Sequence, residues 1–206
     1  INLIAGEPGA GKTIFAIQFL VEGCKRGESG VYITFEEKKD KLYEDMAGFG
    51  WDIEKYEKKG LFRFLEYTPE QVKKLLVEGG GTVDAIVEKI KAKRIVIDSI
   101  TSFSLLYEDE LTKKEAALSL FDLINKWHCT AVLTSQMKSA EHESIMDAAL
   151  EFEVDSIIIL YHSKRKGERI RALEVIKMRG TRIPSQTFGI IIGKNGISVT
   201  QEKIKL

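Results

Sequence analysis

The residues best suited to chemistry form a glycine-rich run near the start of the chain. The run Gly6-Glu7-Pro8-Gly9-Ala10-Gly11-Lys12-Thr13 matches the pattern G-x-x-x-x-G-K-[ST]. Glycines at this spacing let the backbone fold tightly enough for several N–H groups to point at phosphate oxygens. Lys12 can then reach the β- and γ-phosphates, and the Thr13 hydroxyl can ligate Mg²⁺. The residues expected to bind the phosphates are Gly6, Glu7, Pro8, Gly9, Ala10, Gly11, Lys12, Thr13 and Ile14.

A second candidate is the acid that closes an apolar run. Arg94–Asp98 reads as a buried strand that ends in a carboxylate. In a parallel sheet the carboxyl ends of the strands line the ligand crevice. We therefore expect Asp98 to face the glycine-rich loop and to hold Mg²⁺ together with Thr13.

An acidic pair follows another apolar run. Val31–Phe35 leads directly into Glu36 and Glu37. Two carboxylates at the mouth of such a strand could orient and deprotonate a water that attacks the γ-phosphate. The same pair could instead stabilise the N-terminal dipole of a helix expected over Lys38–Phe49. The residues alone leave both interpretations open.

The elements that would position these residues alternate between strand and helix up to about residue 160. The strands are expected at 1–5, 31–35, 61–66, 94–98, 131–135 and 157–160, and the helices at 13–24, 38–49, 70–77, 83–90 and 117–127. This alternation predicts a parallel, doubly wound sheet in a single domain spanning residues 1–206. Three further strands, at 170–177, 187–192 and 196–199, have short turns between them and predict antiparallel strands added at one edge.

Composition narrows the classes of partner. Lys and Arg total 31 and Asp and Glu total 31, so no overall basic excess favours nucleic acid or acidic membrane. No apolar run approaches the roughly 20 residues that span a bilayer. We see no signal peptide and expect a cytoplasmic protein without membrane association. His128, His142 and His162 have no metal-ligand spacing and no set of cysteine partners, so zinc is not expected.

Five segments together resemble a known family. They are Gly6–Thr13, Phe35-Glu36-Glu37, Ile95–Ser99, Thr134-Ser135-Gln136 and Lys177-Met178-Arg179-Gly180-Thr181. In this order they are similar to the RecA superfamily, and within it to the KaiC-like ATPases of archaea and bacteria. The resemblance spans nearly the whole chain and implies a RecA-like α/β fold.

The resemblance also implies roles for individual residues. Glu36 would act as general base with Glu37 in support, and Gln136 would sense the γ-phosphate. Lys177 and Arg179 would act in trans on the nucleotide of a neighbouring subunit. Periodicity alone favours a different interpretation, in which Lys177 and Arg179 are two solvated charges on one face of an edge strand.

The family further implies ATP or ADP with Mg²⁺ as ligands and a homo-oligomeric ring, often a hexamer, with nucleotide at the subunit interfaces. Relatives carry a short glycine-rich segment before the first strand, and we expect that segment to lie outside this sequence. Where the autokinase half of the clock protein has a Ser-Thr pair, this chain has Glu151-Phe152-Glu153. That difference favours hydrolysis over autophosphorylation.

Three other functions are alternatives to ATP hydrolysis. A DNA-acting RecA paralogue is not favoured, because Met137–Asp147 contains Lys138 as its only Lys or Arg beside three acids. A nucleotide-gated interaction module would use bound ATP or ADP to set assembly. An autokinase would transfer phosphate to its own serine.

Overall fold

The computed structural model describes residues 1–104, 106–137, 153–165 and 168–204. The strands are β1 (Asn2–Gly6), β2 (Gly30–Thr34), β3 (Phe62–Glu66), β4 (Arg94–Asp98), β5 (Thr130–Gln136), β6 (Ser156–Arg165), β7 (Glu168–Met178), β8 (Phe188–Gly193) and β9 (Gly196–Lys203). The helices are α1 (Lys12–Lys25), α2 (Lys39–Ala47), α3 (Ile53–Lys58), α4 (Pro69–Val77), α5 (Gly81–Ile90), α6 (Ile100–Ser104) and α7 (Glu110–Lys126).

All of these strands belong to one sheet, in the order β3-β2-β4-β5-β1-β6-β7-β8-β9. The first six strands in this order run parallel, and β7, β8 and β9 continue the sheet through antiparallel pairs. The expected fold class, a RecA-like doubly wound sheet with antiparallel C-terminal strands, is confirmed. Because β1 lies between β5 and β6, its carboxyl end is in the middle of the sheet rather than at an edge.

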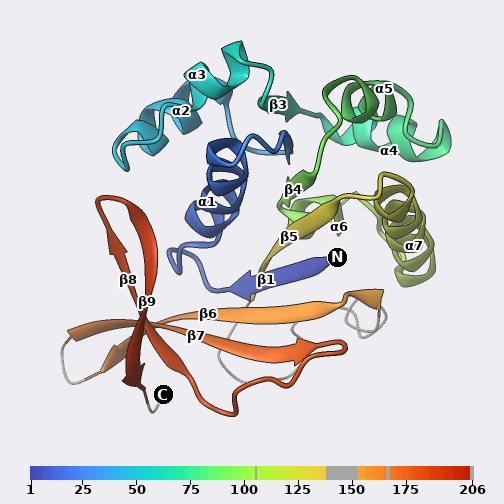
Figure 1. Ribbon diagram of the computed structural model, residues 1–206. Helices are drawn as coiled ribbons and strands as arrows, with labels where there is room; N and C mark the ends of the chain where they lie inside the picture. The colour runs from blue at the N-terminus through green and yellow to red at the C-terminus, as the bar shows by residue number, and fades with distance from the viewer. Residues whose placement is uncertain (105, 138–152, 166–167, 205–206) are drawn as a thin grey trace.

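Helices cover both faces of the parallel strands, as Figure 1 shows. Alternate side chains of β1 pack into different clusters: Leu3 and Ala5 join one, and Ile4 joins the other. The first cluster includes side chains of α4, α5, α6 and α7, and the second includes side chains of α1, α2 and α3. Strands buried on both faces explain the continuous apolar runs of the sequence.

Capping residues explain where several helices begin. A side-chain oxygen accepts a hydrogen bond from the first turn at the start of three helices, at Asp52 for α3, Thr68 for α4 and Asp109 for α7. Such caps satisfy amide groups that have no partner within the helix. The short helices α3 and α6 were not expected from the sequence, and α2 ends at Ala47 rather than at Phe49.

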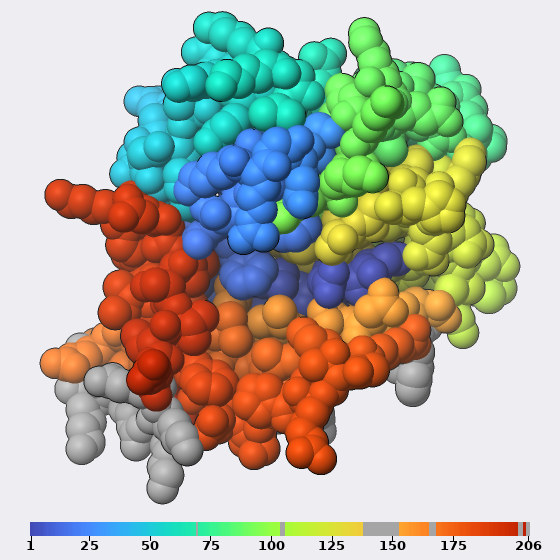
Figure 2. Space-filling view, viewed as in Figure 1, coloured from blue at the N-terminus to red at the C-terminus, as the bar shows by residue number. Residues whose placement is uncertain are grey.

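The C-terminal strands form one side of the molecule, orange to red in Figure 2. The β8–β9 hairpin contacts α1 through Gln18, whose side chain donates to the Ile197 carbonyl at 3.0 Å and accepts from the Ile197 amide at 2.6 Å. These two bonds fix the hairpin beside the helix that follows the glycine-rich loop. Within the described residues, no helix is long and apolar enough to cross a membrane.

Candidate functional site

The glycine-rich loop connects β1 to α1. The backbone is left-handed at Gly9, with φ 77°, and at Gly11, with φ 103°. Glycine reaches these conformations without the steric cost that a Cβ atom adds. The amide of Ala10 donates to the Glu7 carbonyl at 3.2 Å, and α1 begins immediately after Gly11. The loop therefore brings backbone amides and a helix N-terminus together, which is an arrangement suited to anions.

Lys12 folds back over the loop. Its Nζ donates to the carbonyl oxygens of Gly6 at 2.9 Å and Glu7 at 3.0 Å. Burial lowers the pKa of Lys12, although the carboxylates of Asp98 and Glu7 act in the opposite direction. The ammonium group is thus held within the loop and lies close to the acid at the end of β4.

Asp98 accepts hydrogen bonds at both carboxylate oxygens and is 8% exposed. Thr13 Oγ1, in the first turn of α1, donates to Oδ2 at 2.8 Å. The hydroxyl of Tyr32 on β2 donates to the same oxygen at 2.9 Å, and Thr134 Oγ1 on β5 donates to Oδ1. Burial raises the pKa of Tyr32 well above its ordinary value, and the charge of Asp98 adds to the shift. The expected juxtaposition of Thr13 and Asp98 is present, whereas Tyr32 and Thr134 were not expected.

The side-chain oxygens of Thr13 and Asp98 are ligands that suit Mg²⁺. This cation prefers oxygen ligands and keeps several waters, binding proteins through one or two carboxylates together with substrate phosphates. No group of three or more His, Cys, Asp or Glu side chains that could hold a metal is found in the described part of the chain. An ion here would therefore need nucleotide phosphates and water to complete its coordination.

Glu36 and Glu37 lie in the turn after β2, at the same edge of the sheet as Asp98. Their amides donate to Thr34 Oγ1 at 3.2 and 3.0 Å. The Glu36 carboxylate is exposed and accepts a hydrogen bond from the Ser102 hydroxyl on α6. Both acids precede the N-cap residue of α2, whose first-turn acid is Asp40. The pair therefore lies at the carboxyl ends of the strands and outside α2.

Gln136 ends β5 beside the start of the loop. It pairs with Gly6, and the amide of Met137 donates to the Gly6 carbonyl at 3.0 Å. The backbone amide of Gln136 donates to Thr101 Oγ1 at 2.8 Å, and the Gln136 side chain is exposed. The structure thus brings the expected γ-phosphate sensor next to the glycine-rich loop.

Lys177 and Arg179 lie toward the opposite end of the strands. Lys177 pairs with Ile157, which pairs with Leu3, and the Arg179 amide donates to the Asp155 carbonyl at 2.8 Å. At about 3.3 Å per residue, Leu3 is roughly 10 Å from Gly6 along β1. These two cations therefore do not join the loop of their own chain.

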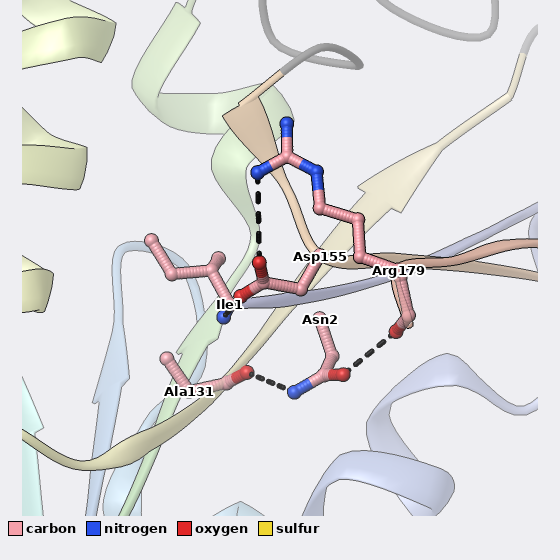
Figure 3. A network of polar contacts seen from close by, with 6 residues as sticks. Ile1, Asn2, Ala131, Asp155 and Arg179 are labelled. Carbon is pink, nitrogen blue, oxygen red and sulfur yellow. Dashed lines mark hydrogen bonds and ion pairs between the residues drawn. The ribbon is translucent and has the colours of Figure 1, made fainter. Parts of the chain in front are cut away.

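Figure 3 shows the surroundings of Arg179. Its guanidinium lies 3.6 Å from Asp155 Oδ1, and Asp155 Oδ2 accepts from the backbone nitrogen of Ile1 at 2.6 Å. The neighbouring Asn2 side chain donates to the Ala131 carbonyl at 3.0 Å. This network joins β1, β5, β6 and β7 at the edge of the sheet away from the glycine-rich loop.

A histidine and an arginine contact the loop from outside. A Cβ placed on Gly9 would lie 3.3 Å from His162 Nδ1, and Arg171 Nε is 3.5 Å from the Gly9 carbonyl oxygen. His162 and Arg171 face each other across β6 and β7. Among the described residues, His162 Nε2 is the one buried side-chain nitrogen or oxygen with no hydrogen-bond partner. This pair forms the outer wall of the loop.

Two sequence segments fall partly outside the described residues. In Met137–Asp147 only Met137 is described, and Glu151 and Phe152 are also outside, whereas Glu153 is exposed. The acidic character of that loop and the comparison with a phosphorylated pair stay predictions from the sequence.

Comparisons with known proteins agree with this geometry. A family model described as the KaiC ATPase matches residues 1–204. The circadian clock protein KaiC3 of Synechocystis is 34% identical over 206 residues, which cover 96% of this chain and 41% of the relative. A UPF0273 protein of Pyrococcus horikoshii is 34% identical over 217 residues, covering 99% of this chain and 87% of the relative. The chain thus spans about two fifths of the clock protein's length.

Among solved structures, the crystal structure of a KaiC-like protein from the hyperthermophilic archaeon Pyrococcus horikoshii superposes with a TM-score of 0.84. The two sequences are 36% identical, and the match covers 96% of this chain and 88% of the other. The structural match therefore covers nearly the whole chain.

Proposed function

The chain belongs to the KaiC family of ATPases, and on this premise we propose that it binds ATP with Mg²⁺ at residues 6–14 and hydrolyses the terminal phosphate. Membership in this family supports nucleotide binding in general. Hydrolysis, the metal and the assembly are specific to our proposal.

The observation that carries the proposal is the hydrogen bond from Thr13 to Asp98 at 2.8 Å. It joins the last residue of the glycine-rich motif to the acid at the end of β4, two strands away from β1. In nucleotide-hydrolysing proteins with this loop, such a pair holds the metal beside the β- and γ-phosphates. Bound Mg²⁺ would neutralise charge on those phosphates as it develops.

Glu36 is our candidate for the general base. A water oxygen attacks the γ-phosphorus, the bond to the β,γ-bridging oxygen breaks, and ADP leaves with the electron pair. The Glu36 carboxylate takes the proton that the attacking water loses. Its exposure at the edge of the sheet leaves it accessible to water, and Ser102 orients it by hydrogen bonding. Glu37 supports Glu36, and Gln136 contacts the γ-phosphate.

Lys177 and Arg179 act on the nucleotide of a neighbouring subunit in our proposal. Their position toward the far end of β7 is incompatible with a role at their own loop but suits a head-to-tail ring, in which one subunit's far edge meets the next subunit's site. A guanidinium supplied in this way stabilises the charge of the transition state and is worth roughly 10³–10⁵ in rate where it occurs. We propose a closed homo-oligomeric ring.

The test of the base is Glu36→Gln, compared with Glu44→Gln as a control on exposed surface of α2. We expect Glu36→Gln to bind ATP normally and to lose at least 100-fold in turnover, because an amide cannot accept the proton. Glu44→Gln should match the wild type. Unchanged turnover in Glu36→Gln would remove Glu36 as the base.

A mixing experiment tests the trans arrangement. Glu36→Gln and Arg179→Ala are each expected to be inactive alone. In mixed rings, some interfaces combine an intact Glu36 from one subunit with an intact Arg179 from its neighbour, so activity should return. If mixing restores no activity while mass spectrometry detects mixed rings, Arg179 does not act in trans.

A further inference from the structure

Asp98 is held by groups on both neighbouring strands. β4 lies between β2 and β5, and the three strands pair in parallel. Val96 pairs with Tyr32 on one side and with Val132 on the other. Side chains two residues apart on a strand share a face, so Asp98 and Thr134 project on the same face as Tyr32. That face is the one covered by α1, which contributes Thr13.

The two strand partners act on different oxygens. Tyr32 donates to Oδ2 at 2.9 Å, and Thr134 donates to Oδ1. One donor on each oxygen opposes rotation of the carboxylate about the bond that joins it to Cβ. Thr13 also donates to Oδ2, at 2.8 Å, and can keep donating while a lone pair of its oxygen faces a metal.

Both partners are rigidly positioned. Tyr32 and Thr134 are 0% exposed. The Tyr32 ring stacks on Phe64 of β3, with ring centroids 5.7 Å apart. Neither hydroxyl can therefore turn toward solvent. Tyr32 donates to Asp98, and Thr134 Oγ1 has Asp98 and, at 3.5 Å, the Ile97 carbonyl oxygen as acceptors.

We propose that Tyr32 and Thr134 form a clamp on Asp98 that sets the affinity of this site for Mg²⁺. The clamp rests on the proposed function, because it has a role only if Asp98 serves a nucleotide-bound metal. Tyr32 and Thr134 are positioning residues, since neither touches the nucleotide or the ion. Partners that orient a metal ligand typically change metal affinity 10- to 100-fold when removed.

The experiment measures metal affinity apart from turnover. Mn²⁺ replaces Mg²⁺ as the probe, and its binding to the full chain is followed by electron paramagnetic resonance with saturating ADP. ADP binding with EDTA present is measured in parallel. The variants are Tyr32→Phe and Thr134→Val, which remove a hydroxyl and keep the shape of the side chain. Tyr43→Phe is the control, because it removes a hydroxyl that donates to Glu57 at 3.1 Å on the α2–α3 side of the molecule.

We expect Tyr32→Phe and Thr134→Val each to weaken Mn²⁺ binding about tenfold, which corresponds to ~1.4 kcal/mol. ADP binding in EDTA should be unchanged, and Tyr43→Phe should match the wild type in both measurements. Should Tyr32→Phe fail to fold, Thr134→Val tests the same clamp from the other oxygen.

The clamp is rejected if the folded variants hold Mn²⁺ within twofold of the wild type. It is also rejected if ADP binding in EDTA falls as much as Mn²⁺ binding, because the hydroxyls would then act through the loop. Wild-type protein that takes up no ADP with the metal present would reject the proposed function and the clamp together. Wild-type binding with unaffected variants would reject the clamp alone.

Discussion

Gly9 and Gly27 provide a matched test of the glycine-rich loop, because both have φ 77°. Alanine in this left-handed region costs about 1–2 kcal/mol. Part of that cost is offset by about 0.4–1 kcal/mol, since alanine restricts the unfolded chain more than glycine does. We therefore expect Gly9→Ala and Gly27→Ala each to lower the free energy of unfolding by about 1 kcal/mol. For a chain of this length the melting temperature should fall by about 2–4 °C.

The surroundings of the two glycines differ. A Cβ at Gly27 would meet no atom within 4 Å, whereas one at Gly9 would lie 3.3 Å from His162 Nδ1. Gly27 follows the far end of α1, about 20 Å from the loop at 1.5 Å per residue. Gly9→Ala should thus shift the loop amides as well as strain the backbone. Losing one amide hydrogen bond to a charged phosphate costs about 1.5–3 kcal/mol, or roughly 10- to 100-fold in nucleotide affinity.

Urea unfolding gives the stability of both variants, and fluorescence titration with a labelled ADP gives their affinity. Similar stability with at least tenfold weaker binding in Gly9→Ala is the expected result. Adding His162→Ala to Gly9→Ala separates crowding from backbone strain, because it removes the imidazole that the new Cβ meets. If Gly9→Ala binds ADP within twofold of Gly27→Ala, the loop amides do not bind the phosphates as we have argued.

Three further predictions concern residues of α1, namely Gln18, Lys12 and Cys24. Gln18→Met should destabilise the fold by about 2 kcal/mol in urea unfolding, because it leaves the backbone amide and carbonyl of Ile197 without their partner. A loss of stability below about 0.5 kcal/mol, which is typical of substitutions on the surface, would contradict this. Burial lowers the pKa of Lys12 from 10.5. As the pH rises, ADP affinity in the wild type should therefore begin to fall before pH 10.5 is reached. Lys12→Met should bind ADP weakly, and its affinity should not change with pH over that range. Burial raises the pKa of Cys24 to about 11, so a thiol reagent at pH 8 should label this residue only after unfolding. Rapid labelling of Cys24 in the native protein, located by mass spectrometry, would refute the burial of this thiol.

Local patterns were enough to predict the parts of the site that are close in sequence. The spacing of Gly6, Gly11, Lys12 and Thr13 fixes a loop that leads into a helix, and the structure has that loop. The apolar strand ending in Asp98 was sufficient to predict which edge of the sheet the acid would occupy, because parallel strands end on the same side. These predictions needed no knowledge of the strand order.

The contacts that depend on strand order could not be predicted. Tyr32, Asp98 and Thr134 meet because β4 lies between β2 and β5, and the sequence does not specify this order. A hydroxyl within an otherwise aliphatic strand was the available signal, since a buried hydroxyl needs a partner. Ser102 was missed with α6, a helix too short to show a periodic pattern. Asp52, which caps α3, was a visible sequence signal for the start of that helix.

The most direct test of the account is calorimetric titration of the folded protein with a slowly hydrolysed ATP analogue and Mg²⁺. We predict saturable binding at one site per chain, competition by ADP, and loss of binding in Lys12→Ala and in Thr13→Ala. Nucleotide binding by residues 6–14 is contradicted if well-folded protein takes up no nucleoside triphosphate with magnesium present, or if both variants bind as tightly as the wild type.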